Sequence, residues 1–80
     1  MIRTTLDTLR PGQNCVVDGI TTPIPHLRQR LMEMGLIRGT RIEMIRFAPT
    51  GDPVEVQVEG FRLSLRKADA EAIVVAREGV

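Results

Sequence analysis

Side chains that could bind a metal or attack a substrate are few in this chain and far apart in its sequence. It has one cysteine, Cys15, and one histidine, His26. A transition-metal site usually takes three or four ligands from histidine, cysteine and carboxylate groups, and a catalytic nucleophile needs a base beside it. Cys15 falls on the apolar face of a predicted strand, and His26 falls at the start of a predicted helix. We therefore expect a buried thiol and a surface imidazole, with no metal site, no catalytic site and no cofactor.

Arginines are numerous for so short a chain and raise the question of phosphate binding: Arg28, Arg30, Arg38, Arg41, Arg46, Arg62 and Arg66. Acidic residues balance them to a formal net charge of +1, so no strong positive field attracts nucleic acid. With two phenylalanines, no tyrosine and no tryptophan, the chain also offers bases little to stack on. We expect a mixed, solvated surface. Nucleic-acid binding stays an alternative, which titration with an oligonucleotide at low salt tests.

The methionines indicate two different environments. Met34 and Met44 are expected to fill gaps in the core, as flexible thioethers do well. Met32 lies about 140° around the helix from Leu27 and so falls outside the apolar stripe. A methionine there, beside Leu36 and Ile37 that we expect to be exposed, predicts a patch that binds a partner. In this patch apolar residues supply affinity and arginines orientation, and its members are Met32, Leu36, Ile37, Arg38 and Arg41.

A helix is expected to carry this patch. Prolines are accepted in a first helical turn, and one apolar stripe follows at helical spacing, formed by Ile24, Leu27, Leu31 and Met34. Gly35 stands where a helix often ends in a left-handed residue, and Leu36 would then fold back onto Leu31. Gly39 turns the chain into the next strand.

Alternating apolar and polar residues predict five strands, at 14–20, 40–47, 54–58, 61–65 and 73–76. Bulges are expected at Gly19 and near Ile45. The two strands at 54–58 and 61–65 form a hairpin, and matching their apolar residues requires a two-residue turn. That register pairs Val58 with Phe61, Val56 with Leu63 and Gln57 with Arg62. One helical turn, 67–71, is expected before the last strand.

These elements predict a mainly β fold, a small SH3-like five-stranded barrel with an inserted helix and a short helical turn before the last strand. Five short strands in 80 residues are too few for a sandwich, whereas a barrel gives one core and protects strand edges. We expect a single domain over residues 1–80. No apolar run is long enough to span a bilayer, no apolar signal core is present, and one cysteine fits a reducing compartment. We therefore expect a cytoplasmic protein.

Several motifs in this order resemble the FeoA domain, over about residues 6–75. They are Leu6, Leu9 and Gly12, then 31–39 (LMEMGLIRG), 48–54 (APTGDPV) and 58–66 (VEGFRLSLR), and last Asp69 and Ala70 followed by Ile73 and Val75. Three features depart from the pattern. Arg38 stands where the family commonly has proline, Phe61 stands where tyrosine is common, and the stretch 21–25 (TTPIP) is unusual.

The resemblance implies an SH3-like barrel that works in bacterial ferrous iron transport with FeoB, a membrane permease for Fe²⁺ that has a cytoplasmic GTP-binding domain. Although the family is associated with metal ions, we expect no metal site in this chain and no enzymatic activity. The leading interpretation is a protein–protein interaction module that docks on this GTP-binding domain. It would assist assembly of the transporter or bias the GTPase between two states. The alternatives are an SH3-like nucleic-acid-binding module and a self-assembling structural module.

Overall fold

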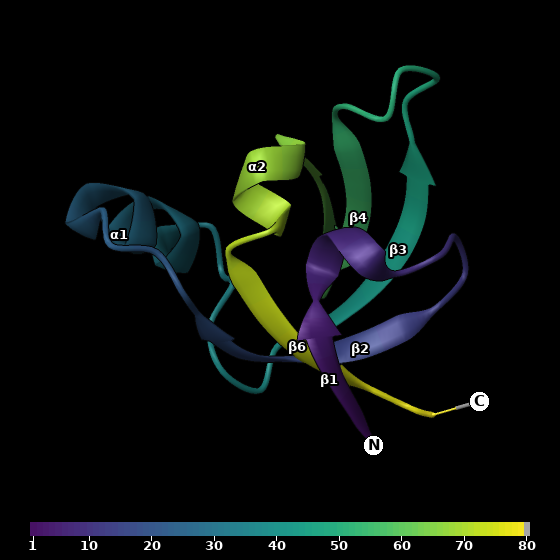
Figure 1. Ribbon diagram of the computed structural model, residues 1–80, viewed down its shortest axis with the longest axis horizontal. Coiled ribbons are helices and arrows are strands. Elements are labelled where there is room, and N and C mark those ends of the chain that lie inside the picture. Colours follow the sequence, from purple (N-terminus) through teal and green to yellow (C-terminus); the bar gives the residue numbers. More distant parts are fainter. Residues whose placement is uncertain (80) are drawn as a thin grey trace.

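Six antiparallel strands form one curled sheet in the computed structural model, which describes residues 1–79. The strand order is β1-β6-β2-β3-β4-β5. Figure 1 shows the sheet strongly curled, with α1 projecting to one side. The elements in chain order are β1 (Ile2–Thr5), the 3₁₀ helix η1 (Leu6–Thr8), β2 (Asn14–Ile20), α1 (Pro25–Glu33), β3 (Arg41–Phe47), β4 (Val54–Val58), β5 (Phe61–Leu65), α2 (Lys67–Ala70) and β6 (Ile73–Arg77).

The mainly β architecture is confirmed, as are all five predicted strands, the inserted helix and the helical turn before the last strand. The predicted number of strands was wrong, because β1 adds a sixth that pairs with β6. Three of its four residues are β-branched, which favours an extended chain. None of the four is buried, so the segment lacks the alternating apolar residues that identify a strand facing a core.

The ends of the sheet are β1 and β5, and no pairing joins these two strands within residues 1–79. The barrel is therefore curled without being closed by a continuous ladder of hydrogen bonds. Phe61 begins β5 directly after the two-residue turn of the hairpin, and its side chain is 44% exposed.

The β4–β5 hairpin has the two-residue turn and the register that the sequence predicts. Val58 pairs with Phe61, Gln57 with Arg62, and Val56 with Leu63. Both expected bulges are present as well. The register shifts between Val17 and Gly19 in β2, and between Met44 and Arg46 in β3. Each bulge adds local twist, which helps the sheet to curl.

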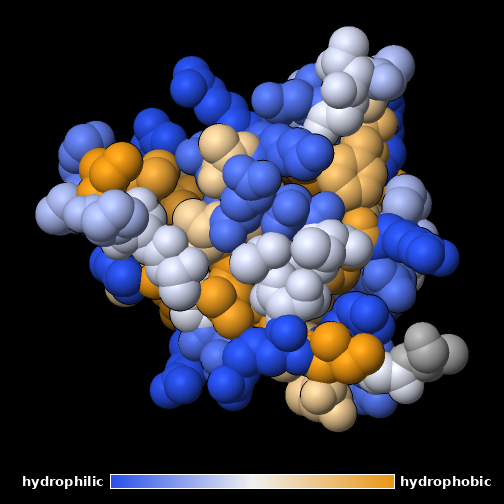
Figure 2. Space-filling view, in the orientation of Figure 1, coloured by the Kyte–Doolittle hydropathy of each residue, from blue (hydrophilic) through white to orange (hydrophobic). Residues whose placement is uncertain are grey.

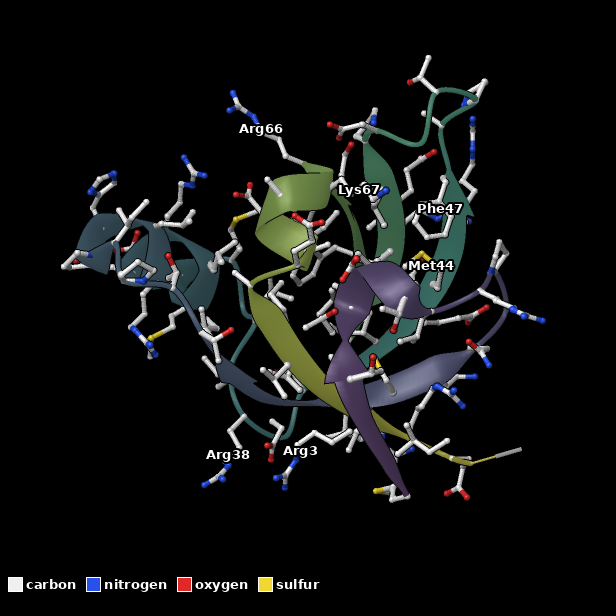
Figure 3. The ribbon with its side chains drawn as sticks, viewed as in Figure 1. Arg3, Arg38, Met44, Phe47, Arg66 and Lys67 are labelled. Carbon is white, nitrogen blue, oxygen red and sulfur yellow. The ribbon has the colours of Figure 1, made fainter. Side chains whose placement is uncertain are left out.

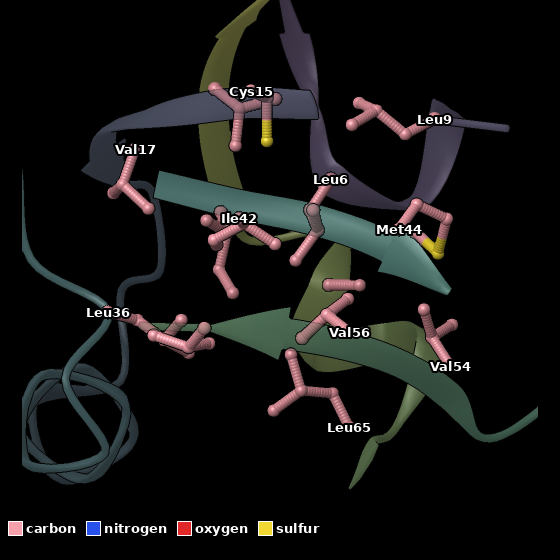
Figure 4. Packing of buried hydrophobic residues seen from close by; sticks show 14 of the residues in the cluster. Leu6, Leu9, Cys15, Val17, Leu36, Ile42, Met44, Val54, Val56 and Leu65 are labelled. Atoms are coloured by element: carbon pink, nitrogen blue, oxygen red, sulfur yellow. The ribbon is translucent and has the colours of Figure 1, made fainter. Parts of the chain in front are cut away.

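The core lies inside the curl and is built almost entirely from aliphatic side chains. Figure 4 shows residues of β2, β3, β4 and β5 meeting there with leucines from the segment that follows β1. The largest fully buried side chains come from strands and connecting segments alike: Leu6, Leu9, Leu31, Leu36, Ile42, Met44, Ile73, Val17, Val54, Val56 and Val75. Met44 fills the core as expected. Met34 is only partly buried and packs against the core from outside.

The N-terminus of α2 is held by the corner between β3 and β4. The backbone N–H of Lys67 donates to Asp52 Oδ1 at 3.0 Å, which satisfies one of the donors that a helix start leaves unpaired. This bond ties a surface corner to the segment that leads into β6.

A candidate docking surface on helix α1

Helix α1 ends as the sequence predicts, in a left-handed glycine. Gly35 has φ +94°, a conformation that residues with a Cβ rarely adopt. Its N–H donates to the Met32 carbonyl at 3.0 Å, and the N–H of Leu36 donates to the Leu31 carbonyl at 3.2 Å. These two bonds form a Schellman motif, which reverses the chain at the end of the helix.

The reversal turns Leu36 inward. Its side chain is 0% exposed, and Figure 4 shows it among the buried side chains. The expectation that Leu36 would be an exposed contact residue was therefore wrong. The residue two positions after the end of the helix folds back onto the last turn in this motif, and Leu36 joins Leu31 in the core.

The start of the helix corrects a second expectation. Ile24 was placed on the buried stripe, yet its side chain is 44% exposed. Pro25 follows it and disfavours a helical conformation for the preceding residue. Ile24 accordingly has extended angles, φ −94° and ψ 106°, and precedes the helix. It therefore does not share the helical spacing of Leu27 and Leu31.

Hydrogen bonds to β2 fix the segment between α1 and β3. The N–H of Gly39 donates to the Val17 carbonyl at 2.9 Å, and the N–H of Val17 donates to the Thr40 carbonyl at 2.9 Å. The Thr40 hydroxyl donates to the Gly35 carbonyl at 2.9 Å. Ile37 therefore sits on a segment that is already ordered, which reduces the entropy lost when a partner binds.

Two hollows that share lining residues lie beside α1. The first has a volume of about 380 Å³ and the second of about 170 Å³. Arg28, Met32 and Ile37 line both, and Met32 and Ile37 are 48% and 50% exposed. The other residues of the first are Pro25, Gln29 and Glu33, and those of the second are Gly19, Ile20, Leu36 and Arg38. Figure 2 shows hydrophobic residues among hydrophilic ones on the side of the molecule that carries α1. We call Arg28, Met32, Ile37 and Arg38 the α1 surface.

Arg38 lines the second hollow and also belongs to a cluster of ion pairs. Its guanidinium lies 3.8 Å from the Asp18 carboxylate, which also pairs with Arg3 at 3.1 Å. Asp18 stands at the β2 bulge, and Figure 3 shows Arg3 and Arg38 extending next to each other. The Asp18 carboxylate thus pairs with two guanidinium groups, and the Arg38 side chain remains 81% exposed.

Three of the five predicted contact residues, Met32, Ile37 and Arg38, are exposed beside the hollows, whereas Leu36 lines the second hollow but is buried. Arg41 is exposed at the start of β3 but lines separate hollows, with residues such as Asn14. The structure adds Arg28, which the sequence predicts only as part of a mixed, solvated surface. Its position four residues before Met32 was the available signal, because residues at this spacing share a helix face.

The thiol and the imidazole lie on different elements. Cys15 is buried in β2, and burial raises the pKa of its thiol to about 11. His26 is exposed on α1. No group of three histidine, cysteine, aspartate or glutamate side chains that could hold a metal ion occurs within residues 1–79.

No helix in this described part of the chain is long and apolar enough to cross a bilayer.

Comparisons of the sequence and of the fold with known proteins point to the same family. The family model of the FeoA domain matches residues 4–77. The Fe(2+) transport protein A/Fe(2+) transporter FeoB fusion protein of Porphyromonas gingivalis is 40% identical over 48 residues, which are 60% of this chain and 6% of that protein. The chain thus corresponds to a small part of this relative.

Solved structures show the same fold. The FeoA protein of Chlorobium tepidum superposes with a TM-score of 0.86 at 38% identity, covering 95% of this chain and 71% of that one. The FeoA of Stenotrophomonas maltophilia, solved in complex with zinc and described as a prokaryotic SH3 domain protein, has a TM-score of 0.80 at 30% identity, covering 91% and 89%. With the family model spanning residues 4–77 and this fold in common, the chain belongs to the FeoA family.

Proposed function

We propose that this chain is a small cytoplasmic accessory protein of bacterial ferrous iron uptake. It acts as one domain, residues 1–80, that binds the cytoplasmic GTP-binding domain of the permease FeoB and modulates it. It works as a binding module without catalytic chemistry of its own.

One observation carries this proposal. The Porphyromonas gingivalis relative unites an Fe(2+) transport protein A and an Fe(2+) transporter FeoB in one polypeptide. In such a fusion the FeoA part and the FeoB part are made in equal amounts and stay close to each other, as suits two proteins that work together. Because this chain belongs to the same family as the smaller part, the fusion supports FeoB as its partner.

The α1 surface supplies a physical basis for binding. Met32 and Ile37 are two large apolar side chains that are about half exposed, and they lie next to hollows that a partner's side chains can fill. Apolar anchors seated in hollows dominate the affinity of most interfaces. Arg38 at the rim adds orientation through long-range electrostatic attraction.

Titration of the chain with the soluble GTP-binding domain of FeoB, and with full-length FeoB, tests the proposal. Wild-type chain is expected to bind, and the double variant Met32→Glu/Ile37→Glu to bind at least about tenfold more weakly, because each change buries a charge at the interface. Ile2→Glu is the matched control, since Ile2 is 40% exposed on β1. Leu36→Glu is unsuitable, because it would disrupt the core.

Modulation has its own measurement. A protein that shifts the GTPase between two states must bind these states with different affinity. We expect the chain to have different dissociation constants for the domain loaded with GDP and with a non-hydrolysable GTP analogue. Equal constants would exclude modulation through the nucleotide state and leave binding in place.

A further inference from the structure

A partner can recognise helix α1 through the side chains of the helix, without hydrogen bonds to its backbone. Leu31 is its one fully buried residue among nine, and Figure 1 shows the helix standing away from the sheet. Backbone groups in the middle of a helix are already hydrogen-bonded, so an added strand would find few partners there. Peptides that add a strand require a free sheet edge, whereas an amphipathic helix needs only a groove.

The hollows have the arrangement that a helix requires. Arg28 and Met32 are four residues apart, so they form a row along α1. The two hollows share these residues and Ile37, so this row borders both of them. A second helix can place its own rows of side chains into the spaces beside such a ridge. The nine residues of α1 extend over about 13 Å, enough for two turns of a partner helix.

The charges of this surface indicate the character of the partner. Arg28 has no ion-pair partner among residues 1–79, and Arg38 shares Asp18 with Arg3. Glu33 is the one acidic residue lining either hollow, and its carboxylate accepts a 3.5 Å hydrogen bond from Gln29. Positive charge is therefore in excess beside apolar hollows. A guanidinium that a partner covers needs a carboxylate, because burying an unpaired charge is costly.

We propose that the α1 surface binds an acidic amphipathic helix of the partner, in which a carboxylate pairs with Arg28 while apolar residues fill the hollows beside Met32 and Ile37. This inference rests on the proposed function and specifies the part of the permease that the chain recognises. It also assigns to Arg28 a binding role that the family resemblance did not suggest.

Charge reversal tests the electrostatic half of the proposal. Arg28→Glu is expected to weaken binding to the soluble domain of FeoB by about tenfold or more, with an unchanged melting temperature. Arg66→Glu is the matched control. Arg66 is exposed, has no ion-pair partner within residues 1–79, and extends into solvent near α2 (Figure 3). The affinity of wild type should also fall with added salt more steeply than that of Arg28→Ala.

Crosslinking tests the helical half. A photoreactive amino acid in place of Gln29, which lines the first hollow, should join to a helical segment of the partner that carries acidic residues. Mass spectrometry of the joined peptides identifies this segment. Crosslinks confined to a strand, a loop or a basic helix would overturn the proposal.

The results separate this inference from the proposed function. If Met32→Glu/Ile37→Glu abolishes binding while Arg28→Glu binds like wild type, docking on FeoB stands and the acidic helix is refuted. If wild-type chain binds neither the soluble domain nor full-length FeoB, both fail. If Arg28→Glu and Arg66→Glu weaken binding equally, the effect comes from the net charge of the protein and the pairing of Arg28 is refuted.

Discussion

At the scale of single residues, the environment decides what a side chain can do. Cys15 has the most reactive side-chain type in the chain, yet it faces the core from β2. The thiolate is the reactive form of cysteine, and an apolar surrounding disfavours that charge. Burial raises the pKa of the thiol from 9.0 to about 11. Cys15 therefore behaves as a small apolar residue at neutral pH.

The raised pKa of Cys15 predicts a loss of stability in alkali. The folded state holds the thiol proton more tightly than the unfolded state, so the stabilisation is complete below pH 9 and disappears as the pH rises from 9 to about 11. Chemical denaturation across this range measures the free energy of unfolding. The decline should be smaller in Cys15→Ala, after allowing for its lower stability at pH 7. The chain has no tyrosine, so no phenolic hydroxyl contributes to the decline. An equal decline in both proteins would contradict the prediction.

Two residues show how far sequence reasoning reaches at this scale. Met32 was placed outside the core from its angle on the helix, and its half-exposed side chain confirms this. Leu36 was predicted both to fold back onto Leu31 and to be exposed, and only the first is correct. Local spacing determines the direction of a side chain within a helix. Beyond the helix, the path of the backbone decides, and the Schellman motif turns Leu36 inward.

At the scale of elements, the end of α1 determines where the docking residues lie. Gly35 reverses the chain, and the bonds of Gly39 and Thr40 to β2 and to Gly35 hold the following segment in place. The orientation of Ile37 relative to Met32 depends on this reversal. A change to the backbone at the helix end is therefore expected to affect both stability and binding.

Replacing Gly35 by alanine tests this dependence. A Cβ at this position would lie 3.6 Å from Phe61 Cζ, an ordinary contact, so the cost comes from φ +94°. We expect Gly35→Ala to lower the free energy of unfolding by roughly 1–2 kcal/mol and to weaken partner binding. Gly19→Ala is the control for stability alone, because that glycine lacks a positive φ and a Cβ added there meets nothing within 4 Å, but it lines the second hollow. Urea denaturation of both variants measures the difference. A free energy of unfolding for Gly35→Ala that is no lower than that of Gly19→Ala would contradict the prediction.

Most elements were predictable because each carries a local signal. The β4–β5 hairpin alternates without interruption, and only one register aligns Val56 with Leu63. The strand β1 carries no such signal, because its position depends on pairing with β6 at the other end of the chain. The hollows beside α1 were not predictable either. They arise where the helix, the β2 bulge and the following segment meet.

At the scale of the whole molecule, the strands contribute more buried side chains to the core than helix α1 does. The sheet surrounds the core, and β2, β3, β4 and β6 each contribute fully buried side chains. Helix α1 contributes one, Leu31, together with the partly buried Leu27, and Met34 directly after the helix is also partly buried. Segments with few buried contacts open more readily than the rest of a domain.

Hydrogen exchange should reveal this difference. We expect amide protons in the second half of α1 to exchange faster than those of β3 and β4, because opening the helix exposes little apolar surface. Addition of the soluble domain of FeoB should slow exchange in α1 and leave β3 nearly unchanged. NMR or mass spectrometry resolves these segments. Slowing that appears on β5 or β6 instead of α1 would place the interface on another face of the sheet.

The pairing of β1 with β6 has a consequence for proteins in which such a domain is joined to a neighbour. Ile2 lies opposite Arg77, so both ends of the domain leave from adjacent strands, and Figure 1 shows them on the side away from α1. A tether can therefore be attached at either end while helix α1 stays uncovered. A short tether raises the local concentration of a binding partner to the millimolar range. Even weak contacts through α1 would then suffice to keep a joined pair engaged.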